Sequence, residues 1–196
     1  MTKLTLDDIA DLRAYERERE GFRKEVIALK KRRRVAVGPH VTFLFENRDT
    51  IRFQIQEMAR VEKILSDDGI QSELDTYNPL IPEPGTLCAT MFIELTDDEQ
   101  LREWLPKLVG VERAPELRLR DGTVVAATPD EAHDAQLTRD TITASVHYLR
   151  FELEPGAVEA FAAGPVQLAV AHPSYAFATE LDEPTRHELL GDLQGR

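Results

Sequence analysis

Polar side chains interrupt the apolar stripe of a predicted helix that spans about residues 47–65. At about 100° per residue, the apolar members of this stripe are Ile51, Met58, Val61 and Leu65. Gln54 falls in the middle of the stripe, and Glu57 and Glu62 border it. A buried amide or carboxylate is unfavourable unless a partner satisfies it, and proteins keep such groups for fold specificity or for a site. This helix is therefore the first place to look for a site.

The first predicted helix, about Asp7 to Arg32, carries the complementary charge. Basic residues interleave with its apolar stripe at Arg19, Arg23, Lys30 and Arg33. A short hairpin separates the two helices, so we expect them to pack together. Arg19 and Arg23 would then meet Glu57 or Glu62, because arginine binds a carboxylate through two parallel hydrogen bonds.

Two interpretations of this cluster remain open. A neutral network of buried ion pairs would only fix how the two helices pack. A surplus of arginine would instead leave a pocket for phosphate, carboxylate or an acidic partner, and the excess of basic groups favours this second interpretation. A helix N-terminus at the mouth of the pocket would add to anion binding. The predicted ligand-binding residues are Arg19, Arg23, Asn47, Arg48, Gln54 and Glu57.

An enzyme acting on a small anionic substrate is the first alternative, with Glu57 as general base and the arginines holding the substrate. The sequence has no Gly-x-Ser-x-Gly motif and no glycine-rich phosphate loop. An enzyme of this kind needs a closed cleft and a carboxylate with a raised pKa. A docking module needs an exposed apolar or charged face.

A metal-binding protein is the second alternative. Strand alternation places His147 and His172 on apolar faces, where two histidines and a carboxylate could hold iron or zinc. The spacings His-x-x-x-His and Glu-x-x-His are absent, and single histidines on an apolar face are more often core residues. Cys88 lies within a predicted strand, which is typical of a buried, inert thiol.

Composition limits the class of protein. A chain of 196 residues is expected to fold as one domain, residues 1–196, and its single cysteine excludes an internal disulfide and fits a reducing cytoplasm. We find no signal peptide and no apolar run long enough to span a membrane, so a cytoplasmic location is expected. A net charge of −12 makes nucleic acid an unfavourable partner.

Hairpins mixed with helices predict an α+β fold, with a mainly antiparallel sheet packed against a long N-terminal helix and several shorter helices. After the first two helices, we predict helices at about residues 70–77, 96–109, 155–163 and 183–193, and a short one from Thr128-Pro129. The predicted strands are residues 34–37, 41–45, 86–95, 116–120, 123–127, 143–153 and 166–171.

The N-terminal part of the chain carries a set of motifs: Tyr15 to Arg19, Arg23, Arg33 to Val35, Gly38-Pro39, Phe45 to Arg48, Thr50 and Gln54 to Met58. Through these residues the chain resembles a bacterial family known as domain of unknown function 3501. The likeness covers the full length, although its specific motifs all precede Arg60. Members tend to be encoded beside rubrerythrin-like and iron–sulfur, heterodisulfide-reductase-like proteins. The resemblance thus implies a redox or oxidative-stress setting, and it carries over no catalytic residue or cofactor.

Together these observations predict a soluble accessory or binding protein with an Arg/Gln/Glu site for an anion or a partner. A rubrerythrin-like or iron–sulfur protein is the partner that the resemblance implies. A symmetric homodimer is the default expectation for its oligomeric state.

Overall fold

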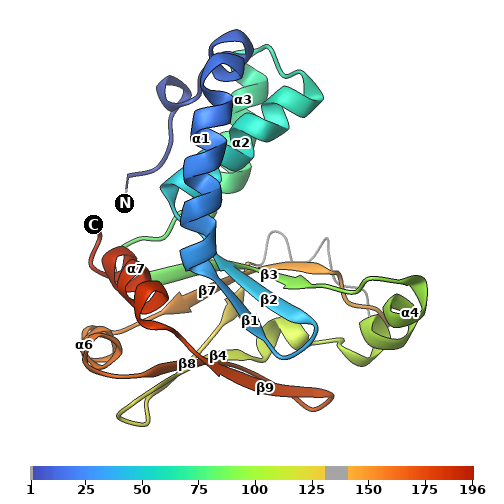
Figure 1. Ribbon diagram of the computed structural model, residues 1–196, viewed down its shortest axis with the longest axis vertical. Helices are drawn as coiled ribbons and strands as arrows, with labels where there is room; N and C mark the ends of the chain where they lie inside the picture. Colours follow the sequence, from blue (N-terminus) through green and yellow to red (C-terminus); the bar gives the residue numbers. More distant parts are fainter. Residues whose placement is uncertain (1, 131–140) are drawn as a thin grey trace.

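The computed structural model describes residues 2–130 and 141–196 and has a helical arm standing on two antiparallel sheets (Figure 1). The first sheet has the strand order β1-β2-β3-β7-β6, and the second has the order β5-β4-β8-β9. The predicted α+β class with antiparallel pairing is confirmed. The sequence patterns did not indicate that the strands divide between two sheets.

The described helices are α1 Leu12–Arg33, α2 Arg48–Glu62, α3 Asp67–Tyr77, α4 Asp98–Lys107, α6 Pro155–Ala163 and α7 Glu183–Leu193. Short 3₁₀ turns lie at η1 Leu6–Asp8, η2 Asn78–Leu80 and η3 Val111–Arg113. The first sheet is built from β1 Arg34–Val37, β2 Val41–Phe45, β3 Thr86–Ile93, β6 Thr128–Pro129 and β7 Val146–Glu152. The second is built from β4 Pro115–Leu119, β5 Val124–Ala126, β8 Val166–His172 and β9 Tyr175–Glu180. Within the described residues, no helix is both long and apolar enough to cross a membrane.

The main hydrophobic core lies between the two sheets. Phe43, Phe45, Phe151 and Phe161 are fully buried within it. Tyr175 of the second sheet lies at one side of this core. Its hydroxyl donates to the Val37 carbonyl at 2.7 Å, and it accepts from the backbone N–H groups of His40 (2.9 Å) and Val41 (3.1 Å). One side chain of β9 therefore fixes both ends of the β1–β2 turn.

Gly38 in that turn has φ +71°, a conformation that favours glycine. A Cβ at this position would lie 2.6 Å from both the Tyr175 hydroxyl and a ring carbon of Phe177. The predicted hairpin of residues 34–37 and 41–45 is confirmed with its register Arg34 to Leu44 and Val37 to Val41.

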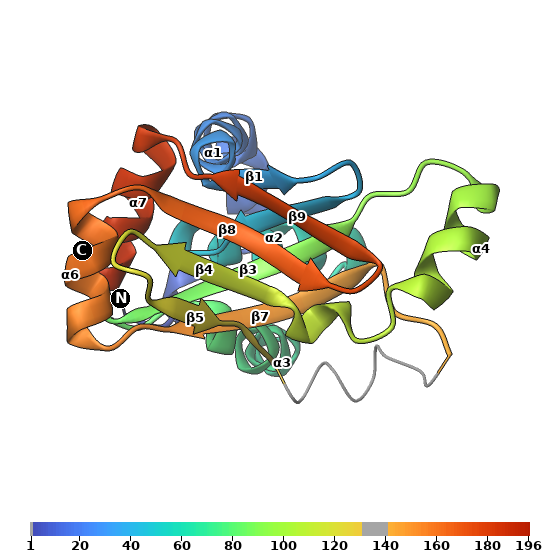
Figure 2. The ribbon, with the colours of Figure 1, turned by 90° about the horizontal axis from the view of Figure 1, so that it is seen from below.

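The arm consists of α1, α2 and α3, and it has an apolar core of its own. Leu4, Ile51, Ile55, Leu74, Leu80 and Ile81 form this cluster. Figure 2 shows the second sheet in front of the first, with α6 and α7 at one end and the outward face of the second sheet free of helices. The arm therefore projects from the sheets as a separate layer (Figure 1).

Several predicted boundaries differ from the structure; for example, α3 begins at Asp67 and not at residue 70, and β7 begins at Val146 and not at residue 143. Helix α1 begins at Leu12, not Asp7, because η1 precedes it and the Asp11 side chain caps it by accepting from the Ala14 N–H. Helix α2 ends at Glu62, because Lys63 takes a left-handed conformation with φ 56°. Thr128-Pro129 forms the short strand β6, and the helix predicted to follow falls largely outside the described residues.

The apolar stripe predicted for α2 is wrong in part. Ile51, Ile55 and Ala59 are the buried apolar residues of this helix, whereas Val61 and Leu65 are 66% and 83% exposed. The sequence prediction also missed β9, whose inward residues begin with Tyr175. Both errors arise where apolar residues are available on more than one face.

Replacing Tyr175 with phenylalanine should lower the free energy of unfolding by about 2 kcal/mol, because one acceptor and two donors lose a buried partner. Chemical denaturation at neutral pH measures this change. The control is Tyr77→Phe, because the Tyr77 hydroxyl makes no hydrogen bond with any group of residues 2–130 and 141–196. Equal stability of the two variants would contradict the role given to the Tyr175 hydroxyl.

Candidate functional site

Arg19 of α1 and Glu57 of α2 form a forked ion pair across the arm. Arg19 Nε donates to Glu57 Oε1 at 2.7 Å, and Arg19 Nη2 donates to Oε2 at 2.9 Å. The Tyr15 hydroxyl also donates to Oε1 at 2.7 Å, and Arg60 Nη2 lies 3.5 Å from Oε2. The two helices thus meet through the predicted pair, and the guanidinium and carboxylate satisfy each other.

The electrostatics of this cluster keep Glu57 ionised. The hydrogen bonds from Arg19 have the largest effect on the Glu57 carboxylate, and the hydrogen bond from Tyr15 adds to it. Together they lower the pKa of Glu57 to about 2, although burial acts in the opposite direction. Burial and the neighbouring Glu57 raise the pKa of the Tyr15 hydroxyl. A general base at neutral pH needs a pKa near 7 and a free lone pair aimed at its substrate. This geometry does not favour Glu57 as a base.

Other predicted members of the cluster lie elsewhere. Arg23 is exposed and makes no ion pair with any residue in the described part of the chain, so the structure does not bring it to Glu57 or to the exposed Glu62. Gln54 is half-buried and lies near Tyr148 of β7, where it counters the rise in the Tyr148 pKa that burial causes. The glutamine that α2 buries completely is Gln56, which accepts from the Ala10 N–H at 2.8 Å and donates to its carbonyl at 3.1 Å.

A second arginine, which the sequence analysis did not single out as a ligand residue, occupies the joint between arm and sheets. Arg33 ends α1 and is only 1% exposed. Its Nε donates to the Phe45 carbonyl at 2.8 Å, and its Nη2 donates to the Glu46 carbonyl at 3.1 Å and to the Asp192 carboxylate. Its Nη1 lies 3.7 Å from Glu188 Oε2, too far for a hydrogen bond.

The segment Phe45 to Arg48 follows directly from this joint. Glu46 is buried, and its carboxylate accepts from Thr50 Oγ1 at 2.5 Å and from Thr90 Oγ1 at 2.6 Å. Asn47 caps α2 because its side chain accepts from the backbone N–H groups of residues 49 and 50. Glu46 and Asn47 therefore set where α2 starts.

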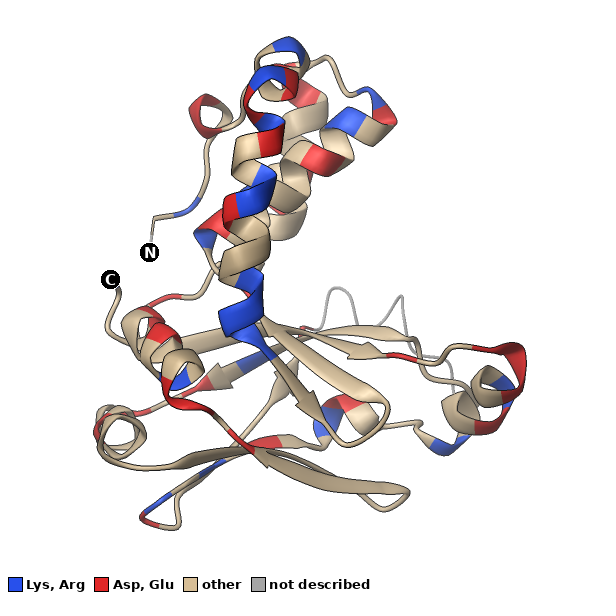
Figure 3. Cartoon of the chain, in the orientation of Figure 1, with Lys and Arg blue, Asp and Glu red and all other residues tan. Residues whose placement is uncertain are grey.

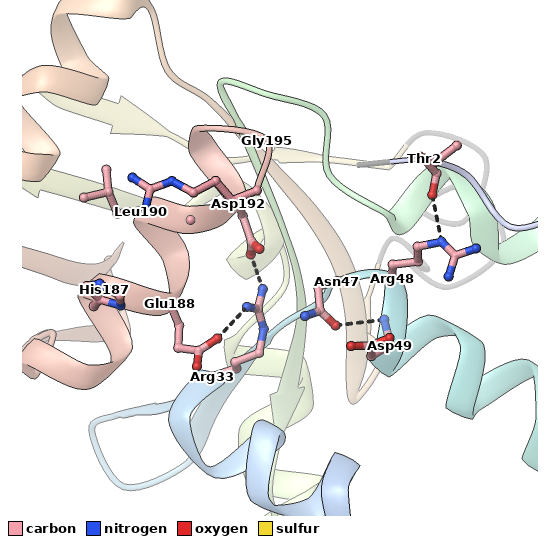
Figure 4. Close-up of a pocket in the computed structure, with 12 residues that line it drawn as sticks. Thr2, Arg33, Asn47, Arg48, Asp49, His187, Glu188, Leu190, Asp192 and Gly195 are labelled. Carbon is pink, nitrogen blue, oxygen red and sulfur yellow. Dashed lines mark hydrogen bonds and ion pairs between the residues drawn. The ribbon is translucent and has the colours of Figure 1, made fainter. Parts of the chain in front are cut away.

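A cavity of about 600 Å³ opens at this joint (Figure 4). Its walls are Thr2, Arg33, Asn47, Arg48, Asp49, His187, Glu188, Leu190, Gly191, Asp192, Gly195 and Arg196. Asn47 and Arg48 thus lie at a cavity as predicted, but it is not the one predicted between α1 and α2. The other four predicted ligand residues, Arg19, Arg23, Gln54 and Glu57, are not in its wall.

Positive and negative groups alternate around this cavity. Arg48 donates to Asp8 Oδ1 at 2.5 Å and to the Thr2 carbonyl at 3.2 Å. Burial raises the pKa of Asp192, and the Arg33 guanidinium opposes that rise. Arg196 makes no ion pair with a carboxylate of the described residues. The cavity wall therefore mixes guanidinium groups with carboxylates, since Arg33 contacts Asp192 of α7 and Arg196 lies just beyond the same helix.

A family model and a solved structure match this chain. A family model described as "Protein of unknown function (DUF3501)" matches residues 3–193. The chain belongs to the DUF3501 family. A crystal structure of a novel protein of unknown function from Burkholderia pseudomallei K96243 has 43% sequence identity and a TM-score of 0.90, and the match covers 98% of this chain and all of that one (100%). No curated protein sequence matches this chain.

Membership in the DUF3501 family supplies no metal ligands, and the histidines predicted as alternatives lie in different sheets. His147 of β7 is buried, and its Nε2 lies 2.9 Å from Thr143 Oγ1 and from the Ala144 carbonyl. His172 of β8 lies 3.1 Å from the Val109 carbonyl through its Nε2. Over residues 2–130 and 141–196, no three His, Cys, Asp or Glu side chains are grouped as a metal site.

The one cysteine of this DUF3501 chain is buried in β3, and burial raises the pKa of the Cys88 thiol to about 11. A thiolate at neutral pH is therefore disfavoured at this position. Cys88 serves as a small apolar core residue.

Arg19→Ala should destabilise the protein, because it leaves the partly buried Glu57 carboxylate without its main partner. Arg23→Ala should leave the melting temperature within about 1 °C of wild type, because surface substitutions change stability little. Thermal denaturation of the two variants in one buffer measures the difference. Similar losses from both substitutions would contradict the assignment of a forked pair to Arg19 alone.

The lowered pKa of Glu57 predicts a particular dependence of stability on pH. Because the folded-state pKa of about 2 lies below the ordinary value of 4.5, the ionised carboxylate stabilises the fold above pH 4.5, and that stabilisation is lost as the pH falls toward 2. Glu57→Gln should therefore have a lower free energy of unfolding than wild type at pH 7. The difference between the two free energies should become smaller as the pH falls from 4.5 to 2. Chemical denaturation at several pH values measures this difference. A difference in free energy of unfolding that stays constant across this range would show that Glu57 does not titrate as described.

Proposed function

We propose that this protein is a non-catalytic accessory protein that binds a small acidic molecule in the cavity between the start of α2 and helix α7. One observation supports this most: three arginines, Arg33, Arg48 and Arg196, contribute to the wall of a cavity of about 600 Å³. That volume lies within the range of known small-molecule sites, roughly 300–1,000 Å³.

The arginines come from separate parts of the chain, so only the folded protein brings them together. Arg33 ends α1, Arg48 begins α2, and Arg196 follows α7. Arg33 is held by two carbonyls and Asp192, and its Nη1 lies 3.7 Å from Glu188 Oε2 in the same wall. Arginine suits carboxylate and phosphate because its planar fork matches two oxygens at once. These groups would bind the acidic end of a ligand.

The carboxylates in the same wall select against a simple polyanion. Asp49 is exposed at the rim, and Glu188 and Asp192 face the cavity from α7 (Figure 4). A ligand that carries amino or hydroxyl groups beside its acidic group would satisfy both kinds of wall. A plain inorganic anion should bind more weakly than such a molecule, because it would leave these carboxylates without a partner.

The enzyme interpretation has less support. Glu57 is ionised, fully engaged and remote from the cavity wall. The redox setting stays part of the proposal because of the family resemblance alone, with a rubrerythrin-like or iron–sulfur protein as partner and the cytoplasm as location. Since Cys88 is buried with a raised pKa, any electron-transfer centre would belong to the partner.

Binding is tested by thermal shift with phosphate, sulfate and citrate as probes. A ligand that binds only the folded state raises its melting temperature with concentration. We expect a rise for wild type with citrate and a smaller one with phosphate. Arg48→Gln should lose the rise, whereas Arg102→Gln, an exposed arginine of α4, should keep it.

The comparison uses the shift and not the starting melting temperature, because Arg48→Gln also removes the ion pair with Asp8. Equal shifts for Arg48→Gln and wild type, or no shift for wild type with any probe, would contradict the proposal. If wild type does show the shift, mass spectrometry of the protein purified under native conditions would identify the natural ligand by its mass.

A further inference from the structure

The free end of the arm carries a small apolar cavity of about 140 Å³. Its apolar lining includes Leu6, Ile9, Leu12, Ile64, Leu65 and Ile70. These residues come from η1, the start of α1, the segment after α2 and the first turn of α3. Ile9 and Ile70 also pack against the apolar core of the arm, so the cavity opens directly onto that core.

Large apolar side chains are exposed around this cavity. Leu65 is 83% exposed, Val61 66% and Leu6 38%. The left-handed Lys63 and the hydrogen bond from the Ile64 N–H to the Ala59 carbonyl reverse the chain after α2. This turn directs Ile64 toward the cavity and leaves Leu65 in solvent. Exposed apolar residues gathered beside a cavity are typical of a binding surface.

Unneutralised carboxylates surround the same end of the arm. Asp7, Asp11, Asp67 and Asp68 are exposed, and none of them forms an ion pair with a residue in the described ranges. Acidic residues at helix N-termini stabilise helices, and Asp11 does cap α1, but that role leaves their charge open to solvent. Along the sides of the arm, by contrast, acidic and basic residues alternate (Figure 3), and carboxylates such as Glu57 are paired with arginine.

We propose that this tip is a docking site for a basic amphipathic segment of a partner protein. An apolar side chain of that segment would enter the cavity beside Leu65, and its lysines or arginines would face the four aspartates. The exposed basic residues near this end, Arg13, Arg17 and Lys63, are fewer than the four aspartates, so the balance still favours a basic partner.

A second copy of this chain does not provide such a segment. Its basic run, residues 30–34, lies at the joint between arm and sheets and is engaged there. Arg33 is buried, Arg32 pairs with Glu188 at 2.7 Å, and Arg34 lies 3.3 Å from Glu94. The occupant is therefore a different protein. The proposal does not depend on what the cavity beside Arg33 binds.

The apolar part of the site is tested with a fluorescently labelled amphipathic peptide of leucine and lysine, followed by anisotropy. Burying a leucine on binding is worth about 1.5–3 kcal/mol, so Leu65→Ser should weaken binding about tenfold or more. Val124→Ser is the matched control, because Val124 is also exposed (54%) but lies on β5. Both replaced side chains are in solvent, so both variants should fold.

The acidic part is tested with the double variant Asp67→Asn and Asp68→Asn. Its matched control is Asp98→Asn with Glu99→Gln, which removes two charges from the first turn of α4. We expect weaker peptide binding for the first variant only, and no binding of a leucine–glutamate peptide to wild type. The measurement is made at physiological salt, where the general attraction to a chain of net charge −12 is screened.

Three results would overturn the docking site: no binding of the leucine–lysine peptide to wild type, unchanged binding by Leu65→Ser, or equal weakening by the tip and α4 charge variants. The cavity proposal has separate readouts. Leu65→Ser should keep the citrate-induced rise in melting temperature, and Arg48→Gln should keep peptide binding. Failure of one proposal therefore leaves a clear result for the other.

Discussion

The buried guanidinium of Arg33 is the interaction on which the rest of the structure depends. It ends the long helix α1 and binds the Phe45 and Glu46 carbonyls at the end of β2, together with Asp192 of α7. A charge that is 1% exposed is strongly unfavourable unless its donors are satisfied. Since Arg33 and its partners come from three parts of the chain, they hold the arm, the first sheet and the last helix in one arrangement.

This joint also sets the position of α2. Glu46 is fixed by the hydroxyls of Thr50 and Thr90, and Asn47 then caps the helix. The forked ion pair between Arg19 and Glu57 then joins α2 to α1 within the arm. The charges in the middle of the arm therefore stabilise the fold and neutralise one another. The two surfaces that we propose for binding lie at the ends of the arm: the cavity beside Arg33 at the base and the apolar cavity at the tip.

Local signals in the sequence predicted most helices and strands, but they did not predict which face of α2 is buried. Asn47 and the hairpin around Gly38 were recognised, because caps and turns depend on neighbouring residues. In α2, apolar residues are present at Ile51, Ile55 and Met58 as well as Val61, so periodicity alone does not choose between two stripes. The choice came from tertiary packing, which buries Gln56 against the backbone of Ala10.

Long-range partners explain why the cavity was not predicted. Arg33 is one of five consecutive basic residues, and nothing local distinguishes it from its neighbours. Its carboxylate partner Asp192 is 159 positions away. Asn47 and Arg48 were chosen for a helix N-terminus that could bind an anion, and they do line a cavity, but the other side of that cavity is α7. Pairing across such separations leaves no pattern in a single sequence.

The most direct measurement is the free energy of unfolding of Arg33→Lys beside Arg32→Lys. Lysine keeps the charge at either position but lacks the planar fork that reaches two carbonyls and a carboxylate. The account predicts a loss of about 3–5 kcal/mol for Arg33→Lys, as for a broken buried ion pair, and less than about 1 kcal/mol for the half-exposed Arg32→Lys. Equal, small losses for both variants would contradict the central role of the Arg33 joint.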